Sequence, residues 1–283
     1  MTQPMQTSRE ILQITPGVAA TDGDGVKMTR IIGSQELNVL DPFLLLDAFE
    51  SDHPDDYIGG FPSHPHRGFE TVTYLLAGRM RHKDNAGNEG VIEPGGVQWM
   101  TAGKGIIHSE MPEQENGLLM GFQLWVNLPA SAKMTQPAYQ EFPPVSVPLE
   151  QRENGTLVRV ISGTTNEGTR GPVENSYVRP TYLDVTLPAG EAFEQVVGAS
   201  DNAFVFVIEG DVLIGNGRQS LGYRQLGITG QGDHITVSAG GDARFLLVAG
   251  RPLNEPIARG GPFVMNTKAE VMQAFADYQN GQF

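Results

Sequence analysis

The chain has 283 residues, of which 39% are hydrophobic, so it can form one large domain or two of ordinary size. It contains no cysteine. This excludes disulfides, thiolate metal ligands and a cysteine nucleophile, and leaves histidine and carboxylate side chains for any metal site. The formal net charge of −14 opposes direct binding to nucleic acid, because a phosphate backbone attracts clustered lysine and arginine. Any role near DNA would therefore run through a protein partner.

The sequence predicts no membrane segment. No apolar run approaches the roughly 18 residues that a spanning helix needs. The first residues, MTQPMQTSREILQ, lack the basic and apolar regions of a secretion signal. We therefore expect a soluble, cytoplasmic protein.

Short strands joined by tight turns dominate the predicted elements. The chain has 35 glycines and 19 prolines, and turn dipeptides such as Asp24-Gly25 and Asn216-Gly217 separate short β-branched runs. Strand-like segments recur over residues 69–125 and again from 157 to 250, on either side of a Pro- and Gln-rich linker candidate at 129–155. This weak duplication predicts an all-β protein with two similar domains in tandem, residues 1–140 and 141–283.

The C-terminal segment NTKAEVMQAFADYQNG changes to a helical period. Thr267 and Glu270 fit a capping box, and Gly281 stands where a helix would stop. We expect a short amphipathic helix that packs on the C-terminal domain. Its predicted apolar face consists of Val271, Met272, Phe275 and Tyr278.

The segment HPHRGFETVTYLL at 64–76 carries two histidines at the start of a strand. Residues two apart share one face of a strand, so His64 and His66 should project together, with Glu70 and Tyr74 beyond them if the strand is regular. Pro65 supplies no N–H to a sheet, so this stretch should be a strand start, a bulge or an edge. An H-x-H pair alone is more often a polar patch than a metal site.

A second pair favours metal binding. The segment GIIHSE presents His108 and Glu110 on one face by the same rule. If the two strands are neighbours in a small barrel, three imidazoles and one carboxylate converge. This set resembles the two-His, one-carboxylate arrangement of non-haem iron(II) oxygenases, and tetrahedral zinc is also chemically reasonable.

The other histidines are weaker candidates for metal ligands. His53 lies in a polar loop and should be solvated, and His234 should have a surface or hydrogen-bonded role. His82 could line a pocket. Glu70 is either a fifth ligand or a hydrogen-bond acceptor for an imidazole. For Arg67 a structural salt bridge is favoured over steering of an anionic substrate.

Several further residues near the proposed site have packing roles by default. One or two of the large apolar side chains should reach the pocket, and the rest should fill the core. These are Trp99, Met100, Phe122 and Trp125. Turn-forming and packing roles are expected for Asp41, Phe43 and Asp47.

Motifs along nearly the whole chain resemble the pirin family of the cupin superfamily. The matching segments are DPFLLLDAFE, GGFPSHPHRGFETVTYLLAG, VQWMTAGKGIIHSEMP, FQLWVNL and PLNEPIARGGPFVMNTKAE. The resemblance implies a bicupin fold of two antiparallel jelly-roll barrels with a metal site in the N-terminal barrel only. The implied ligands are His64, His66, His108 and Glu110.

This sequence meets the general cupin motif G-x5-H-x-H-x3,4-E-x6-G only loosely. The flanking glycines are displaced. In the pirin pattern the glutamate of the general motif, here Glu70, is not the usual metal ligand, and the glutamate two residues after the third histidine, here Glu110, binds the metal instead. The segment GEAFEQVVGASDNAFVFVIEG has no H-x-H, so the C-terminal barrel should be metal-free and structural.

The resemblance also implies two functions. One is quercetin 2,3-dioxygenase activity, in which a divalent metal, most simply Fe(II), with Zn, Ni, Cu, Mn or Co as alternatives, binds a flavonol that reacts with O₂. Glu110 would accept the hydroxyl proton, and CO would be released. The other is a redox-sensitive regulatory protein that acts through a protein partner. A third alternative is a cupin enzyme that acts on another small molecule, because metal ligands specify the chemistry better than the substrate. The dioxygenase is favoured, because no basic segment or nuclear-import signal is present.

Overall fold

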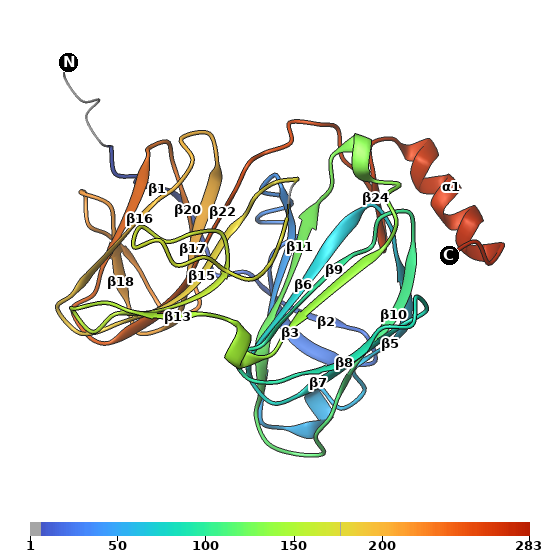
Figure 1. The fold of residues 1–283 in the computed structure, drawn as a ribbon, viewed down its shortest axis with the longest axis horizontal. Helices are drawn as coiled ribbons and strands as arrows, with labels where there is room; N and C mark the ends of the chain where they lie inside the picture. The colour runs from blue at the N-terminus through green and yellow to red at the C-terminus, as the bar shows by residue number, and fades with distance from the viewer. Residues whose placement is uncertain (1–6, 176) are drawn as a thin grey trace. The chain divides into compact units, whose positions relative to one another are not determined.

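The computed structural model describes residues 7–175 and 177–283, and the all-β prediction is confirmed (Figure 1). The first six residues, which form part of the segment examined for a secretion signal, lie outside the described residues. Within the described residues, no helix has the length and apolar character to cross a lipid bilayer.

The chain forms two compact units, but they are not the contiguous halves expected from the sequence. The first unit comprises residues 18–146 and 253–283, and the second comprises the chain up to Gly17 together with 147–252. The N-terminal strand has joined the second unit because it pairs with a strand that begins at Leu226. The C-terminal segment returns to the first unit.

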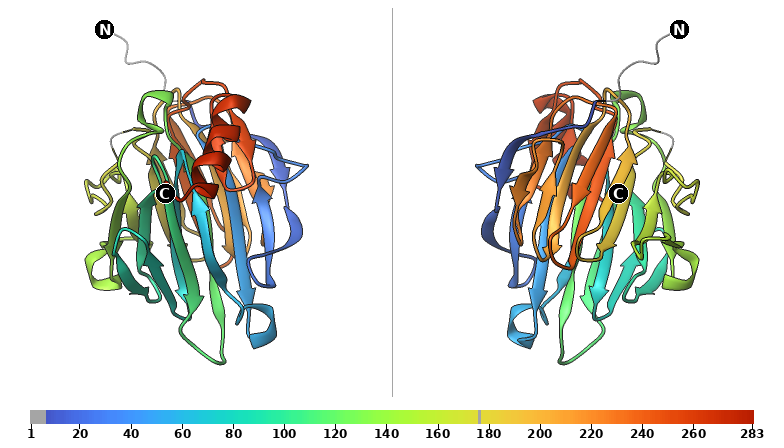
Figure 2. Two further views of the ribbon diagram at one scale, coloured as in Figure 1. Left: turned by 90° about the vertical axis from the view of Figure 1, so that its right-hand side faces the viewer. Right: turned by 90° about the vertical axis from the view of Figure 1, so that its left-hand side faces the viewer.

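The described part of the first unit contains a seven-stranded and a four-stranded antiparallel sheet, with a small hairpin (Figures 1 and 2). The larger sheet has the order β12 (Ala138–Phe142), β9 (Val97–Thr101), β6 (Phe69–Ala77), β11 (Leu119–Asn127), β4 (Phe43–Ser51), β3 (Val26–Ile32) and β2 (Val18–Asp22). The smaller sheet has the order β5 (Phe61–His66), β10 (Ile106–Pro112), β7 (Met80–Asp84) and β8 (Glu89–Ile92). The hairpin is β23 (Ala258–Gly260) with β24 (Phe263–Met265), and the short 3₁₀ turns are η1 (Pro54–Asp56), η2 (Ala130–Ala132) and η3 (Pro144–Ser146).

The described part of the second unit repeats the same two-sheet arrangement. Its larger sheet has the order β1 (Ile11–Thr15), β20 (Leu226–Thr229), β17 (Asn202–Glu209), β22 (Ala243–Gly250), β15 (Thr181–Leu187), β14 (Leu157–Ser162) and β13 (Leu149–Gln151). Its smaller sheet has the order β16 (Ala192–Val196), β21 (His234–Ser238), β18 (Val212–Ile214) and β19 (Gln219–Leu221). The predicted duplication is therefore present in the strand order. The linker candidate 129–155 carries β12 and β13, which are edge strands.

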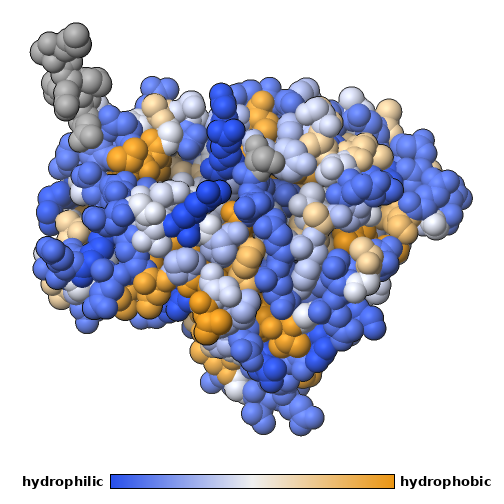
Figure 3. Space-filling view, in the orientation of Figure 1, coloured by the Kyte–Doolittle hydropathy of each residue, from blue (hydrophilic) through white to orange (hydrophobic). Residues whose placement is uncertain are grey.

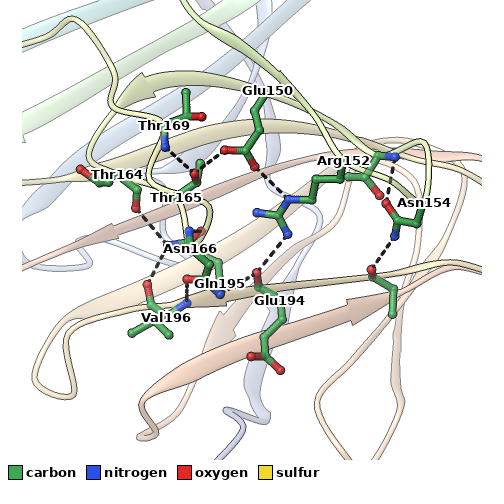
Figure 4. A network of polar contacts seen from close by, with 12 residues as sticks. Glu150, Arg152, Asn154, Thr164, Thr165, Asn166, Thr169, Glu194, Gln195 and Val196 are labelled. Carbon is green, nitrogen blue, oxygen red and sulfur yellow. Dashed lines mark hydrogen bonds and ion pairs between the residues drawn. The ribbon is translucent and has the colours of Figure 1, made fainter.

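Apolar side chains fill the interior of the second unit. Its buried cluster includes Phe193, Val205, Ile235, Val237 and Phe245. Beside this core, a polar network fastens the loop around 163–170 to β13 and β16 (Figure 4). The Thr165 hydroxyl of the loop donates to Glu150 on β13, and the Asn166 side chain accepts from the Val196 backbone on β16 at 2.9 Å. These contacts are structural, since they join neighbouring elements of one unit.

The predicted C-terminal helix is α1 (Lys268–Gln279), and its Thr267–Glu270 capping box is confirmed. Its expected packing on the C-terminal domain is wrong, because α1 contacts β23 and β24 of the first unit. Val271 and Ala274 are the buried positions, whereas Met272 of the predicted apolar face is 67% exposed. The outer side of the helix is mostly hydrophilic (Figure 3).

Candidate metal centre

Three histidines converge inside the first unit, as the sequence predicts. His64 and His66 lie at the end of β5, and His108 lies on the neighbouring strand β10, directly opposite His64. One ring nitrogen from each histidine lies within 4.8 Å of those of the other two. Antiparallel pairing of two short strands is thus enough to assemble the cluster.

The contacts of His64 and His66 fix which ring nitrogen faces the cluster. Nδ1 of His64 lies 2.8 Å from the carbonyl oxygen of Pro62, and Nδ1 of His66 lies 3.4 Å from that of Pro262. A carbonyl oxygen can only accept, so in each neutral ring Nδ1 carries the hydrogen and Nε2 offers a lone pair. The two Nε2 atoms lie 3.0 Å apart.

His108 is oriented by a chain of buried groups on β7. Its Nδ1 lies 3.4 Å from Nδ1 of His82, and Nε2 of His82 lies 3.1 Å from the Asp84 carboxylate. Burial opposes ionisation of Asp84, but hydrogen bonds from Asn88 and His82 lower its pKa. The ionised Asp84 accepts from His82, whose Nδ1 can then accept from His108. This leaves Nε2 of His108 as the lone-pair nitrogen, and it is buried without a hydrogen-bond partner among the described residues.

These three nitrogens fit a divalent transition metal. Two nitrogen ligands at about 2.1 Å from one ion, and at about a right angle, lie about 3.0 Å apart, which is the spacing of the His64 and His66 Nε2 atoms. Burial also lowers the pKa of His66 and of His108 well below the ordinary value. These two rings are therefore neutral, as metal ligands must be.

Glu110, expected as the fourth ligand, lies on the same strand as His108 but has its own partners. A register shift separates the two residues in the pairing of β10 with β5. The Glu110 carboxylate accepts from Thr73 at 2.6 Å and from Gln123 at 2.8 Å, and it lies outside the three-histidine cluster. Each carboxylate oxygen has two acceptor sites, so both oxygens keep capacity for a further contact.

A polar row beneath Glu110 was missed by the sequence analysis. It crosses the larger sheet through residues that pair from strand to strand, namely Arg30, Asp47, Gln123, Thr73 and Gln98. Asp47, expected to form a turn or to pack, instead accepts two bonds from Arg30 at 2.9 and 2.7 Å. The partners of these residues are distant in sequence, so no local motif could reveal the row.

A cavity of about 710 Å³ adjoins the cluster. His64, His66 and Glu110 line one part of it. Its remaining wall includes apolar side chains (Leu45, Phe49, Phe61 and Trp125), two guanidinium groups (Arg30 and Arg259) and three carboxylates (Asp22, Asp24 and Asp47). A space of this size suits a small organic molecule.

The structure also places the remaining candidates. Glu70 is not among the clustered ligands, because β5 ends at His66 and β6 belongs to the other sheet. Thr73 faces Glu110, so Glu70, three positions earlier, points to the opposite face, where it accepts from Thr101 at 2.7 Å. Arg67 has the favoured structural role, since it donates to Asp277 of α1 at 2.6 Å.

The other histidines and the large apolar side chains largely behave as expected. His53 is exposed, and His234 is hydrogen-bonded to Asp233 at 2.6 Å. His82 does not line the cavity but contacts His108 behind the cluster. Of the four apolar candidates, Trp125 reaches the cavity, and the buried ones are Trp99, Met100 and Phe122.

Comparisons with known proteins give one consistent result. A family model described as Pirin matches residues 25–126, and one described as the pirin C-terminal cupin domain matches residues 182–283. A pirin-like protein of Caulobacter vibrioides is 54% identical, over 97% of this chain and 99% of its own. A Pseudomonas aeruginosa protein with the provisional name quercetin 2,3-dioxygenase is 45% identical, over 98% of this chain and 99% of its own. The crystal structure of a quercetin 2,3-dioxygenase from Acinetobacter baumannii superimposes with a TM-score of 0.89 at 36% identity, over 98% of each chain.

Proposed function

The chain belongs to the pirin family, and on this premise we propose that it is a metal-dependent dioxygenase that cleaves flavonols such as quercetin. The observation that supports this proposal most strongly is the convergence of three imidazoles, each with Nε2 turned inward, beside a cavity of small-molecule size. The names of the Pseudomonas and Acinetobacter relatives point to the same chemistry.

The proposed ligands are His64, His66, His108 and Glu110, and the proposed metal is Fe(II). When bound, such an ion lowers the pKa of a coordinated hydroxyl group and supplies redox chemistry toward O₂. The overall reaction combines one flavonol with one O₂ and yields a depside and one CO.

Glu110 is the proposed base for the 3-hydroxyl proton of the flavonol. Thr73 and Gln123 hold its carboxylate from the opposite sheet, which fixes its orientation toward the cavity. A base must lie within hydrogen-bond reach of the proton it accepts, so this fixed orientation is part of the proposed mechanism.

The apolar wall of the cavity holds the flat rings of the substrate. Phe49, Phe61 and Trp125 line the cavity and offer aromatic surface to a flavonol. These side chains also displace water from the ring that reacts, which strengthens the electrostatic contacts of Glu110.

The test is oxygen uptake and CO release by Fe(II)-loaded protein with quercetin. The His66→Ala variant should lose both signals, because it removes one of the proposed ligands. The matched control is His53→Ala, which removes an exposed histidine and should leave both signals unchanged. Undiminished turnover by His66→Ala, or no flavonol cleavage by the metal-loaded wild type, would rule out the proposal.

A further inference from the structure

Two guanidinium groups of the described residues line the cavity, those of Arg30 and Arg259. Of these two, Arg30 forms salt bridges with carboxylates. Arg30 donates to Asp47 at 2.9 and 2.7 Å and to Asp22 at 2.8 Å. Its charge is therefore balanced inside the protein, and few of its donors are left for a ligand.

Arg259 on β23 is the second guanidinium. Its contacts are a long hydrogen bond to the carbonyl oxygen of Leu44, at 3.4 Å, and a position 4.8 Å from the centroid of the Trp125 ring. It forms no salt bridge with a carboxylate of the described residues, and Asp47 and Asp22 act on it only through longer-range electrostatic attraction. A guanidinium carries five N–H donors, so most of those of Arg259 are available to a bound molecule.

Trp125 links Arg259 to the metal centre. The same indole that lies 4.8 Å from the Arg259 guanidinium lies 5.1 Å from the His66 ring, centroid to centroid. A flat aromatic molecule with one oxygen at the three-histidine cluster can therefore lie along Trp125 and present its far end to Arg259. Arginine pairs with carboxylate or sulfate groups through two parallel hydrogen bonds.

We propose that Arg259 determines substrate specificity by pairing with an anionic group on the substrate, at the end opposite the oxygen that reacts. The preferred substrate class is then an aromatic hydroxy compound with a second, anionic substituent, and neutral quercetin is a poorer member of that class. This inference rests on the proposed function, because it takes the three-histidine cluster as the reacting end of the site.

The test measures binding in the absence of O₂, so that no turnover is needed. Zn(II)-loaded protein is titrated with 3-hydroxyflavone and with its 4′- and 7-carboxylates, and quenching of tryptophan fluorescence gives each Kd. The wild type should bind at least one carboxylate about tenfold more tightly than the parent, and the preference should shrink at high salt.

The variants separate charge recognition from a structural effect. Arg259→Gln should bring the ratio of the two Kd values close to one, and Arg259→Lys should restore part of the preference because it keeps the charge. The matched control is Arg218→Gln, which changes an exposed arginine of the second unit and should keep the wild-type ratio. Equal Kd values in the wild type, or a preference that survives in Arg259→Gln, would overturn the inference.

The two proposals fail in different ways. If the carboxylate preference depends on Arg259 but no flavonol supports oxygen uptake, the specificity inference holds and the dioxygenase proposal fails. If flavonols are cleaved but the wild type shows no carboxylate preference, the dioxygenase proposal holds and the role of Arg259 is rejected.

Discussion

Each histidine of the cluster can bind a metal ion only through a ring nitrogen without a proton, and the contacts of the opposite nitrogen decide which one that is. In His64 and His66, a backbone carbonyl oxygen accepts the hydrogen of Nδ1 and so leaves Nε2 for the metal. In His108, the acceptor for the Nδ1 hydrogen is His82, which is itself hydrogen-bonded to Asp84. The His108 contact is therefore the one that a side-chain substitution can remove.

The His82→Phe variant should bind the metal about 10 to 100 times more weakly, because His108 loses the acceptor for its Nδ1 hydrogen. Phenylalanine keeps the ring that stacks on Tyr139 at 4.7 Å, so the fold should be retained. The measurement is a competition titration against a chelator, with His53→Phe as the control. A wild-type Kd in His82→Phe would show that the chain on β7 does not orient His108.

The Glu110→Gln variant should lower kcat on quercetin by a factor of about 100 or more, because an amide cannot accept the hydroxyl proton. The matched control is Glu153→Gln, which alters an exposed glutamate of the second unit. Steady-state oxygen uptake, measured together with metal content, checks this prediction. Full activity in Glu110→Gln would exclude the carboxylate as the base.

The buried histidines predict how the stability of the metal-free protein depends on pH. Burial lowers the pKa of His66 and of His108 in the folded state, so below about pH 6.5 the unfolded chain binds more protons than the folded one. The free energy of unfolding should therefore decrease as the pH is lowered below about 6.5, by about 1.4 kcal/mol per pH unit for each histidine. Denaturant unfolding at pH 7.5 and 5.5 measures this slope. It should be smaller in His66→Asn, and an equal slope in that variant would contradict the assignment.

Single residues of the site were predictable where strand alternation alone decides the direction of a side chain. His64, His66 and His108 satisfy that condition. Glu70 does not, because the chain leaves β5 and enters another sheet at Gly68, which has a positive φ of 90°. Thr73, Gln123 and Arg259 approach the site through long-range pairing, which one sequence does not encode locally.

At the scale of secondary-structure elements, the β23–β24 hairpin connects the C-terminal segment to the site. It supplies Arg259 to the cavity wall and the carbonyl oxygen of Pro262 to His66. The buried Lys133 holds this hairpin in place, since its Nζ donates to Val264 at 2.9 Å and to Gly68 and Asn127 at 2.8 Å. Burial lowers the pKa of Lys133 to about 8, so the amine is still mostly protonated at pH 7.

The Lys133→Met variant should be less stable by about 3 kcal/mol or more, because three buried acceptors lose their donor and methionine fills the space without replacing it. Urea unfolding measures the loss. Lys83→Met, a change on an exposed part of β7, is the control. Wild-type stability in Lys133→Met would show that the hairpin is held by its apolar contacts instead.

The C-terminal helix illustrates what a local pattern can and cannot decide. Its boundaries and cap follow from Thr267, Glu270 and the helical period, and these were predicted. Its partner was not, because the identity of the surface that covers Val271 depends on where the chain from 253 onward returns.

At the scale of the whole molecule, the two units share one strand order but differ in their interiors. The first carries the polar row and the three histidines, whereas Phe193, Ile235 and Val237 fill the smaller sheet of the second. The family and the two-cupin fold were predictable, because the pattern of short strands and the quoted motifs span most of the chain. The exchange of terminal segments between the units was not predictable, since it depends on pairing between residues far apart in the sequence, such as Ile11 with Thr229 and Arg67 with Phe263.

The central claim is that three histidines of the first unit hold one metal ion. The most direct measurement is the anomalous scattering of a crystal of the metal-loaded protein. The account predicts one peak per chain, bound by Nε2 of His64, His66 and His108, and no peak inside the second unit. A metal-loaded crystal with no peak at these three nitrogens would contradict it.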